Sequence, residues 1–177
     1  MMLKDKIKSL AKAYKEEVIQ NRRHLHSHPE LSYQEYETAK FVKSKLEEIG
    51  IESLEQKATT GWTALIKGKN PDKKVIALRA DMDALPIIEA NEVPYKSQNP
   101  GVMHACGHDA HTASLLGAAK ILNEVKDQFE GTIKLIFQPG EEVAPGGASY
   151  MIKDGALNNP RPNGIIGQHV MPFIPAG

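Results

Sequence analysis

Cys106 and His108 are the first residues in this sequence whose types and spacing suggest chemistry. They lie in the segment MHACGHDAH, residues 103–111. A thiolate and an imidazole are suitable ligands for zinc, manganese or a similar first-row ion, and side chains two positions apart in extended backbone can reach one metal. Asp109 follows directly and could orient these ligands. The structural alternative is a helix entry with a buried thiol and a capping aspartate.

Glu141 and Glu142 are adjacent carboxylates that follow the apolar segment IKLIFQP. Because neighbouring side chains diverge, one could ligate a metal while the other faces the substrate water as a general base. A pair of glutamates taken alone is more often a solvated acidic loop. The presence of Cys106 and His108 as possible metal ligands in the same chain favours the catalytic interpretation.

Three further residues follow predicted strands and could join the same site. Asp81 and Asp83 come directly after VIALRA, and His169 closes GIIGQH. Alternation along extended backbone directs both aspartates to the same side, so one of them could hold a ligand histidine in its correct tautomer. The alternatives are turn chemistry for the aspartates and a core position for His169, which we favour as a ligand.

The other histidines carry weaker signals. His24, His26 and His28 lie next to a predicted helix end, where cationic or capping roles are a simpler explanation than metal binding. His104 and His111 flank Cys106 and could contact a substrate, although their spacing does not establish this.

The elements that would position these residues alternate between helix and strand. The first segment has an apolar residue every three to four positions and predicts one amphipathic helix that Pro29 stops. Ser32 and Glu35 form a potential capping box for the next helix, and Gly50 is suited to end it. The remaining pattern predicts strands at residues 63–67, 74–80, 132–137 and 164–170, and helices at 110–126 and 148–153.

This order predicts an α/β fold, with a mixed, mostly parallel sheet and helices on both faces. Ligands bind beyond the carboxyl ends of the strands in such sheets. Asp81 and Asp83, Glu141 and Glu142, and His169 all follow strands. We therefore expect them to converge on one site.

Composition limits the class of protein. The chain has 177 residues, of which 41% are hydrophobic and 25% charged, which is typical of a globular domain. Lys+Arg and Asp+Glu both total 22, so no net charge draws the chain onto nucleic acid or anionic lipid. No segment approaches the ~20 apolar residues of a membrane span, and the single cysteine fits a reducing compartment. We expect a cytoplasmic protein with no nucleic-acid or membrane partner.

The chain resembles the metallo-aminoacylase and carboxypeptidase superfamily, in particular its amidohydrolase branch. That branch contains hippurate hydrolases, N-acyl-L-amino acid amidohydrolases, auxin-conjugate hydrolases and N-acetyl-diaminopimelate deacetylases. The strings that carry the resemblance follow one another along nearly the whole chain: RRHLHSHPELSYQEYETAKFV, ALRADMDALPI, PGVMHACGHDAHTASLLGAA, IFQPGEE, GGASYMIKDGAL and GQHVMP.

The resemblance implies a truncated catalytic domain of a two-metal, exopeptidase-like hydrolase. Cys106 would bridge two divalent ions (Zn, Mn, Co or Ni), with further metal ligands at His108, Glu142 and His169. Glu141 would be the general base, and Asp83 would support the site. The substrate would be an N-acyl amino acid, a related small conjugate or a short peptide, and its binding residues are not identified.

The resemblance also implies that residues 1–177 are the N-terminal part of the metal-binding domain. Family members carry an inserted lid and dimerisation domain after GQHVMP, and then a return segment with another ligand histidine; neither is in this chain. The full-length form is expected to be a homo-oligomer. The alternative to an amidohydrolase is a folded but inactive fragment, and a thiol hydrolase with Cys106 as nucleophile is a third possibility.

Overall fold

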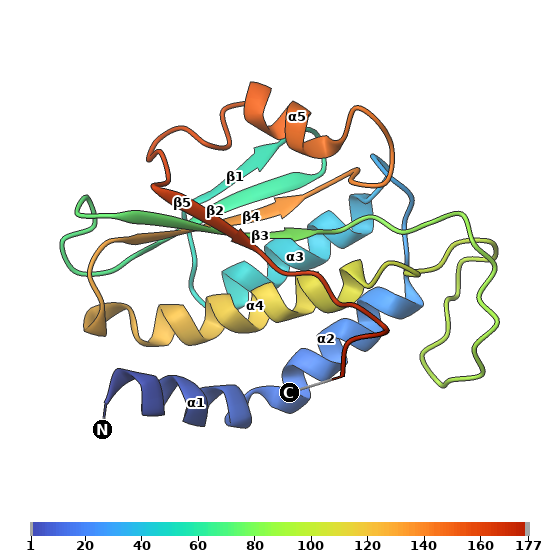
Figure 1. The fold of residues 1–177 in the computed structure, drawn as a ribbon, viewed down its shortest axis with the longest axis horizontal. Coiled ribbons are helices and arrows are strands. Elements are labelled where there is room, and N and C mark those ends of the chain that lie inside the picture. The colour runs from blue at the N-terminus through green and yellow to red at the C-terminus, as the bar shows by residue number, and fades with distance from the viewer. Residues whose placement is uncertain (1, 176–177) are drawn as a thin grey trace.

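A single five-stranded sheet with helices on both faces forms the framework of the protein (Figure 1). The structure is a computed structural model that describes residues 2–175. Its helices are α1 (Leu3–Ala13), α2 (Lys15–Ser27), α3 (Tyr36–Glu48), α4 (His108–Glu124) and α5 (Gly147–Lys153), with a 3₁₀ turn at Lys126–Gln128. Its strands are β1 (Leu54–Lys57), β2 (Gly61–Lys67), β3 (Val75–Asp81), β4 (Thr132–Gln138) and β5 (Gly164–Gly167).

The sheet is mixed, in the order β1-β2-β4-β3-β5. Strand β4 pairs in parallel with β3, which pairs in parallel with β5. The β1–β2 and β2–β4 pairings are antiparallel. The mixed α/β fold is confirmed, with the parallel pairings confined to one half of the sheet. The short edge strand β1 was not predicted, because its sequence LEQK lacks an apolar run.

Apolar side chains fill the space between the sheet and the helices on each face. The larger cluster joins α3 and α4 to the sheet and includes Val42, Leu46, Leu116, Leu135 and Phe137. On the other face, Met151 of α5 packs with Ala77 and Ile136. Helices α1 and α2 pack outside α4 as an additional layer, as Figure 1 shows. No described helix has both the length and the apolar character needed to cross a membrane.

Two details of the N-terminal helices differ from the sequence prediction. The first predicted helix is broken at Tyr14, which lies outside helical geometry at φ −92° and ψ 2°. The predicted capping box is wrong, because the Ser32 hydroxyl donates to Asp83 and the Glu30 carboxylate accepts from the first backbone N–H groups of α3. Gly50 ends α3 with φ +78°, as expected.

The three strands that carry the site lie side by side. Because β4, β3 and β5 run parallel, their carboxyl ends meet at one edge region of the molecule (Figure 1). The backbone beyond β3 carries Asp83, that beyond β4 carries the two glutamates, and that beyond β5 carries His169. The predicted final strand is shorter than expected, so His169 lies in the segment that follows it.

Strand β4 lies in the centre of the sheet, so a substitution in it tests the assignment of the hydrophobic core. Leu135 is fully buried in β4, and Leu135→Ala is expected to lower the free energy of unfolding by about 2–5 kcal/mol, because it leaves a cavity between α4 and the sheet. Ile165 on the edge strand β5 is 56% exposed, so Ile165→Ala is the control and should stay within about 0.5 kcal/mol of wild type. Denaturant unfolding measures both values, and equal losses would contradict the assignment of the core.

Candidate metal centre

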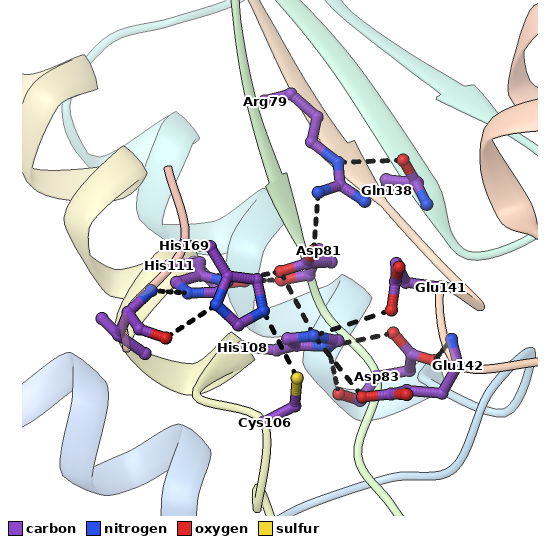
Figure 2. Close-up of polar contacts among 12 residues, drawn as sticks. Arg79, Asp81, Asp83, Cys106, His108, His111, Gln138, Glu141, Glu142 and His169 are labelled. Carbon is purple, nitrogen blue, oxygen red and sulfur yellow. Dashed lines mark hydrogen bonds and ion pairs between the residues drawn. The ribbon is translucent and has the colours of Figure 1, made fainter. Parts of the chain in front are cut away.

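The predicted site residues come together at the carboxyl ends of β3, β4 and β5 (Figure 2). Cys106 lies in the turn before α4, and its Sγ is 3.4 Å from Nε2 of His169. His108 is the first residue of α4, and its Nε2 lies 3.7 Å from Oε1 of Glu142 and 3.9 Å from Oε2 of Glu141. The predicted convergence is therefore present in the fold.

His108 is held so that one ring nitrogen faces the centre of the cluster. Its Nδ1 lies 2.9 Å from the backbone oxygen of Asp83 and 3.2 Å from Oδ1 of the same residue. Both partners are acceptors, so Nδ1 carries the proton. Nε2 is thereby left to accept a metal or a proton, which is the arrangement in which a carboxylate orients a ligand histidine.

Two atoms in this cluster are buried without a hydrogen-bond partner in the described part of the chain. They are Nε2 of His108 and Oε1 of Glu142. Buried polar atoms are normally paired, so two facing acceptors at 3.7 Å indicate a site for a cation between them. The residues present therefore fit a divalent metal ion.

Among the described residues, the side chains that can hold metal form three overlapping groups. One is Cys106, His108 and His169, another is His108, Glu141 and Glu142, and the third is Asp81, His108 and His111. His108 belongs to all three groups. The set combines thiolate, imidazole and carboxylate donors, which accept zinc and other first-row divalent ions.

The adjacent glutamates differ in exposure. The Glu142 side chain is 20% exposed and its backbone N–H donates to Oδ2 of Asp83 at 3.0 Å. The Glu141 side chain is 42% exposed. Both carboxylates point toward Nε2 of His108, and Glu141 is the more exposed of the two (Figure 2).

His111 joins this site, which its spacing alone did not establish. Its Nδ1 lies 2.6 Å from Oδ1 of Asp81, and its Nε2 accepts the backbone N–H of Val170 at 2.9 Å. His111 therefore fixes the backbone next to His169. The available signal was its position on α4, because a residue three places after His108 lies on the same helical face.

Gly107 allows the segment at Val170 to lie close to the start of α4. It precedes α4 with φ +87°, a conformation that glycine adopts without strain. A Cβ at this position would lie 2.2 Å from Cγ2 of Val170. The glycine thus lets the segment that carries His169 pack against the start of α4.

Negative charge dominates the cluster. Burial, followed by the hydrogen bond and charge of Glu142, raises the pKa of the Cys106 thiol to about 12. Burial opposes protonation of His108, but the hydrogen bond with Asp83 and the nearby carboxylates raise the pKa of His108 above its usual value. The carboxylates contribute to both shifts, and a bound cation would oppose their contribution.

Four other predicted candidates lie outside this cluster. His24 stacks on Phe41 with ring centroids 4.3 Å apart, and Nδ1 of His28 is 2.8 Å from the His24 carbonyl oxygen at the end of α2. His104 is buried, which lowers its pKa to about 4. Asp109 does not orient the ligands, because its carboxylate bonds to α2 instead.

His26 has an unexpected role as a buried link. Its Nδ1 lies 2.8 Å from Oδ2 of Asp109 in α4, and its Nε2 lies 2.9 Å from Oε1 of Glu89. Glu89 also accepts the backbone N–H of Ser97 at 2.6 Å. His26 therefore ties α2 and the long segment after β3 to the first turn of α4.

Comparison with known proteins agrees with this geometry. A model of Peptidase family M20/M25/M40 matches residues 77–177, more than half of the chain. The chain belongs to this family. It is 48% identical over 169 residues to an N-acyl-L-amino acid amidohydrolase of Geobacillus stearothermophilus, a match that covers 96% of this chain and 45% of the relative. An N-acetylcysteine deacetylase of Bacillus subtilis (strain 168) is 48% identical, with 94% and 43% covered.

A solved structure supports the same assignment. A Bacillus subtilis protein described as a dinuclear metal binding peptidase from the M20 family superposes with a TM-score of 0.86 at 47% identity. The match covers 93% of this chain and 45% of that one. The chain therefore spans less than half the length of the relatives it matches, and it corresponds to their N-terminal part.

His111 provides a test of how the site is assembled. His111→Ala removes the acceptor for the Val170 N–H and the partner of Asp81, so His169 loses its support. We expect about a 10-fold loss of Co²⁺ affinity, in the range for residues that orient ligands. Competition with a chromophoric chelator measures it. His24→Ala is the control and should leave affinity unchanged, and an unchanged affinity in His111→Ala would contradict the role.

The His26 link predicts a pH dependence of stability. The hydrogen bond with Asp109 is the main reason that the pKa of His26 is raised, and burial opposes it. A raised folded-state pKa gives a stabilisation that is complete below the unfolded pKa of about 6.5 and is lost as pH rises through the folded pKa. The stability advantage of wild type over His26→Gln is therefore expected to shrink as the pH rises above about 6.5. Denaturant midpoints across this range measure it, and a constant difference would refute the link.

Proposed function

We propose that this chain is the metal-binding half of an amidohydrolase that cleaves the N-acyl bond of N-acyl amino acids or related small conjugates. The observation that carries the proposal is the unpaired, facing pair of His108 Nε2 and Glu142 Oε1, beside the solvent-reaching carboxylate of Glu141. A cation site next to a free carboxylate is the arrangement that metal-assisted hydrolysis requires.

Each residue has a distinct task in this proposal. Cys106, His108, Glu142 and His169 would hold two divalent ions. Bound ions would polarise the amide carbonyl and lower the pKa of the attacking water. Glu141 takes the proton from that water and passes it to the departing amine nitrogen. Asp83 keeps His108 in the tautomer whose Nε2 faces the cluster.

The substrate class rests on the relatives. One is named an N-acyl-L-amino acid amidohydrolase and another an N-acetylcysteine deacetylase, each 48% identical to this chain. Other relatives are named thermostable carboxypeptidases, at 45–46% identity, so a short peptide is a related candidate substrate. Zinc and manganese are the leading candidate metals, since the ligand set mixes a thiolate with imidazoles and a carboxylate. We also propose a cytoplasmic location, because one free cysteine suits a reducing compartment.

The relatives are more than twice as long as this chain, and we propose functions for the part that it does not span. We infer that this part supplies another ligand histidine, a lid over the substrate and the contacts of a homo-oligomer. The isoleucines of β5 are 56% exposed, and β5 is an edge strand of the sheet formed by residues 2–175, which is consistent with further polypeptide packing there. The competing hypothesis is that residues 1–177 fold but do not catalyse.

A thiol hydrolase is less consistent with the site. A nucleophilic cysteine needs a lowered pKa, whereas the surroundings of Cys106 raise its pKa to about 12. Such an enzyme would also leave Glu141 and Glu142 without a task. It would resist chelators and be inactivated by thiol alkylation.

The adjacent glutamates allow the proposal to be tested by a matched pair of variants. Glu142→Gln is expected to weaken Co²⁺ binding by about 10- to 100-fold, because it removes a charged ligand. Glu141→Gln should leave metal binding within a few fold but lower kcat on N-acetyl and N-benzoyl amino acids by about 10²- to 10⁴-fold, because it removes the base. Metal titration of each variant and a ninhydrin assay of released amino acid measure the two effects.

Controls separate the hypotheses. The exposed residue Glu92 is outside the cluster, so Glu92→Gln should behave as wild type. A chelator should abolish turnover, and added metal should restore it. If residues 1–177 bind metal but show no turnover, while the full-length form is active, the inactive-fragment hypothesis holds for the chain alone. Loss of metal binding in Glu141→Gln but not in Glu142→Gln would overturn the assigned roles.

A further inference from the structure

Glu35 is a fully buried carboxylate that none of the proposed chemical steps uses. It lies immediately before α3 and is 0% exposed. Its Oε1 accepts the backbone N–H of Tyr33 at 2.9 Å and that of Gly140 at 2.7 Å, and its Oε2 accepts the Thr60 hydroxyl at 2.7 Å. Both oxygens act as acceptors, so one side chain joins three segments that are far apart in the sequence.

The contact with Gly140 is next to the proposed base and metal ligand. Gly140 directly precedes Glu141, and its carbonyl oxygen accepts the N–H of Gly147 at 2.7 Å. The Gly140 peptide groups are therefore held on the N–H side by Glu35 and on the carbonyl side by α5. With φ +55°, Gly140 also has no room for a Cβ, which would lie 2.2 Å from the Tyr33 ring.

Neighbours of Glu35 hold the rest of the same loop. The Tyr33 hydroxyl donates to the carbonyl oxygen of Val143 at 3.0 Å. The Ser32 hydroxyl donates to Oδ2 of Asp83 at 2.6 Å, and the same oxygen accepts the Glu142 N–H. Residues 32–35 thus contact the loop at residues 140–143 at both ends, directly or through Asp83.

A buried carboxylate is a costly way to fill space. Burial disfavours the charged form and raises the pKa of Glu35, although its hydrogen bonds oppose the shift. An apolar side chain would avoid this cost but would leave the Gly140 N–H without an acceptor. The arrangement therefore indicates a requirement for the acceptor at this point rather than for packing alone.

We propose that Glu35 is a positioning residue, which fixes the Gly140 peptide and thereby sets the directions of the Glu141 and Glu142 side chains. The inference rests on the proposed function, in which these glutamates are base and ligand. Glu35 itself touches neither substrate nor metal. Its effect on the site is exerted through the backbone of the loop.

Metal affinity tests the proposal without relying on turnover. In the 177-residue chain, Glu35→Ala is expected to weaken Co²⁺ binding, followed by visible absorption, about 10- to 100-fold, as for other residues that orient ligands. Glu35→Gln keeps an acceptor oxygen at the same reach and should bind Co²⁺ nearly as well as wild type. Val42→Ala is the control: Val42 is buried in α3, so this variant should lose stability without losing metal affinity.

Glu35→Asp keeps the test decisive if the alanine variant does not fold. It retains the charge but is one methylene too short to reach Gly140, so positioning predicts that aspartate loses affinity and glutamine retains it. A role of charge alone predicts the reverse order and would overturn the proposal, as would wild-type affinity in both Glu35→Ala and Glu35→Asp. The proposed function fails separately, if wild type binds no Co²⁺ or if Glu142→Gln binds it as wild type does.

Discussion

The parallel pairing of β4, β3 and β5 is the constraint on which the site depends. Strands that run in the same direction end at the same edge of the sheet. Residues that follow these strands therefore lie close together although they are far apart in the sequence. The register places Asp81 of β3 opposite Gln138 of β4. The strand pairing therefore brings the aspartates at the end of β3 close to the glutamates after β4.

Side chains then hold the segments that follow β4 and β5 by accepting hydrogen bonds from their backbone N–H groups. Asp83 accepts a hydrogen bond from the Glu142 N–H, and His111 accepts one from the Val170 N–H. Glu35 accepts one from the Gly140 N–H. Each acceptor belongs to a different element from its donor. Irregular backbone near a site would otherwise leave buried N–H groups unpaired. The loops of the site are thus held by hydrogen bonds from their backbone N–H groups to side chains.

The sequence allowed much of this to be predicted, because local patterns reflect local physics. The apolar run VIALRA and the acidic residues after it indicated a buried strand and its functional end, and the structure places Asp81 and Asp83 there. Pairings across the chain were not accessible in this way. Ser32 has the spacing of a helix cap, yet its hydroxyl donates to Asp83 because the fold brings a stronger acceptor to it. Tyr14 interrupts an otherwise regular helical pattern. Glu35 was predicted only as part of the capping box, because its partners Thr60 and Gly140 lie 25 and 105 residues away.

The difference between the two adjacent glutamates follows from the same constraint. The N–H of Glu142 is bound to Asp83, which is itself bound to His108, so the Glu142 carboxylate faces the buried ring nitrogen. The Glu141 carboxylate lies 3.9 Å from the same nitrogen but keeps 42% of its side chain exposed. Two identical residue types can thus differ in solvation because the backbone between them is fixed. Burial of Glu142 suits the proposed metal ligand, and exposure of Glu141 suits the proposed base, which must exchange protons with water and substrate.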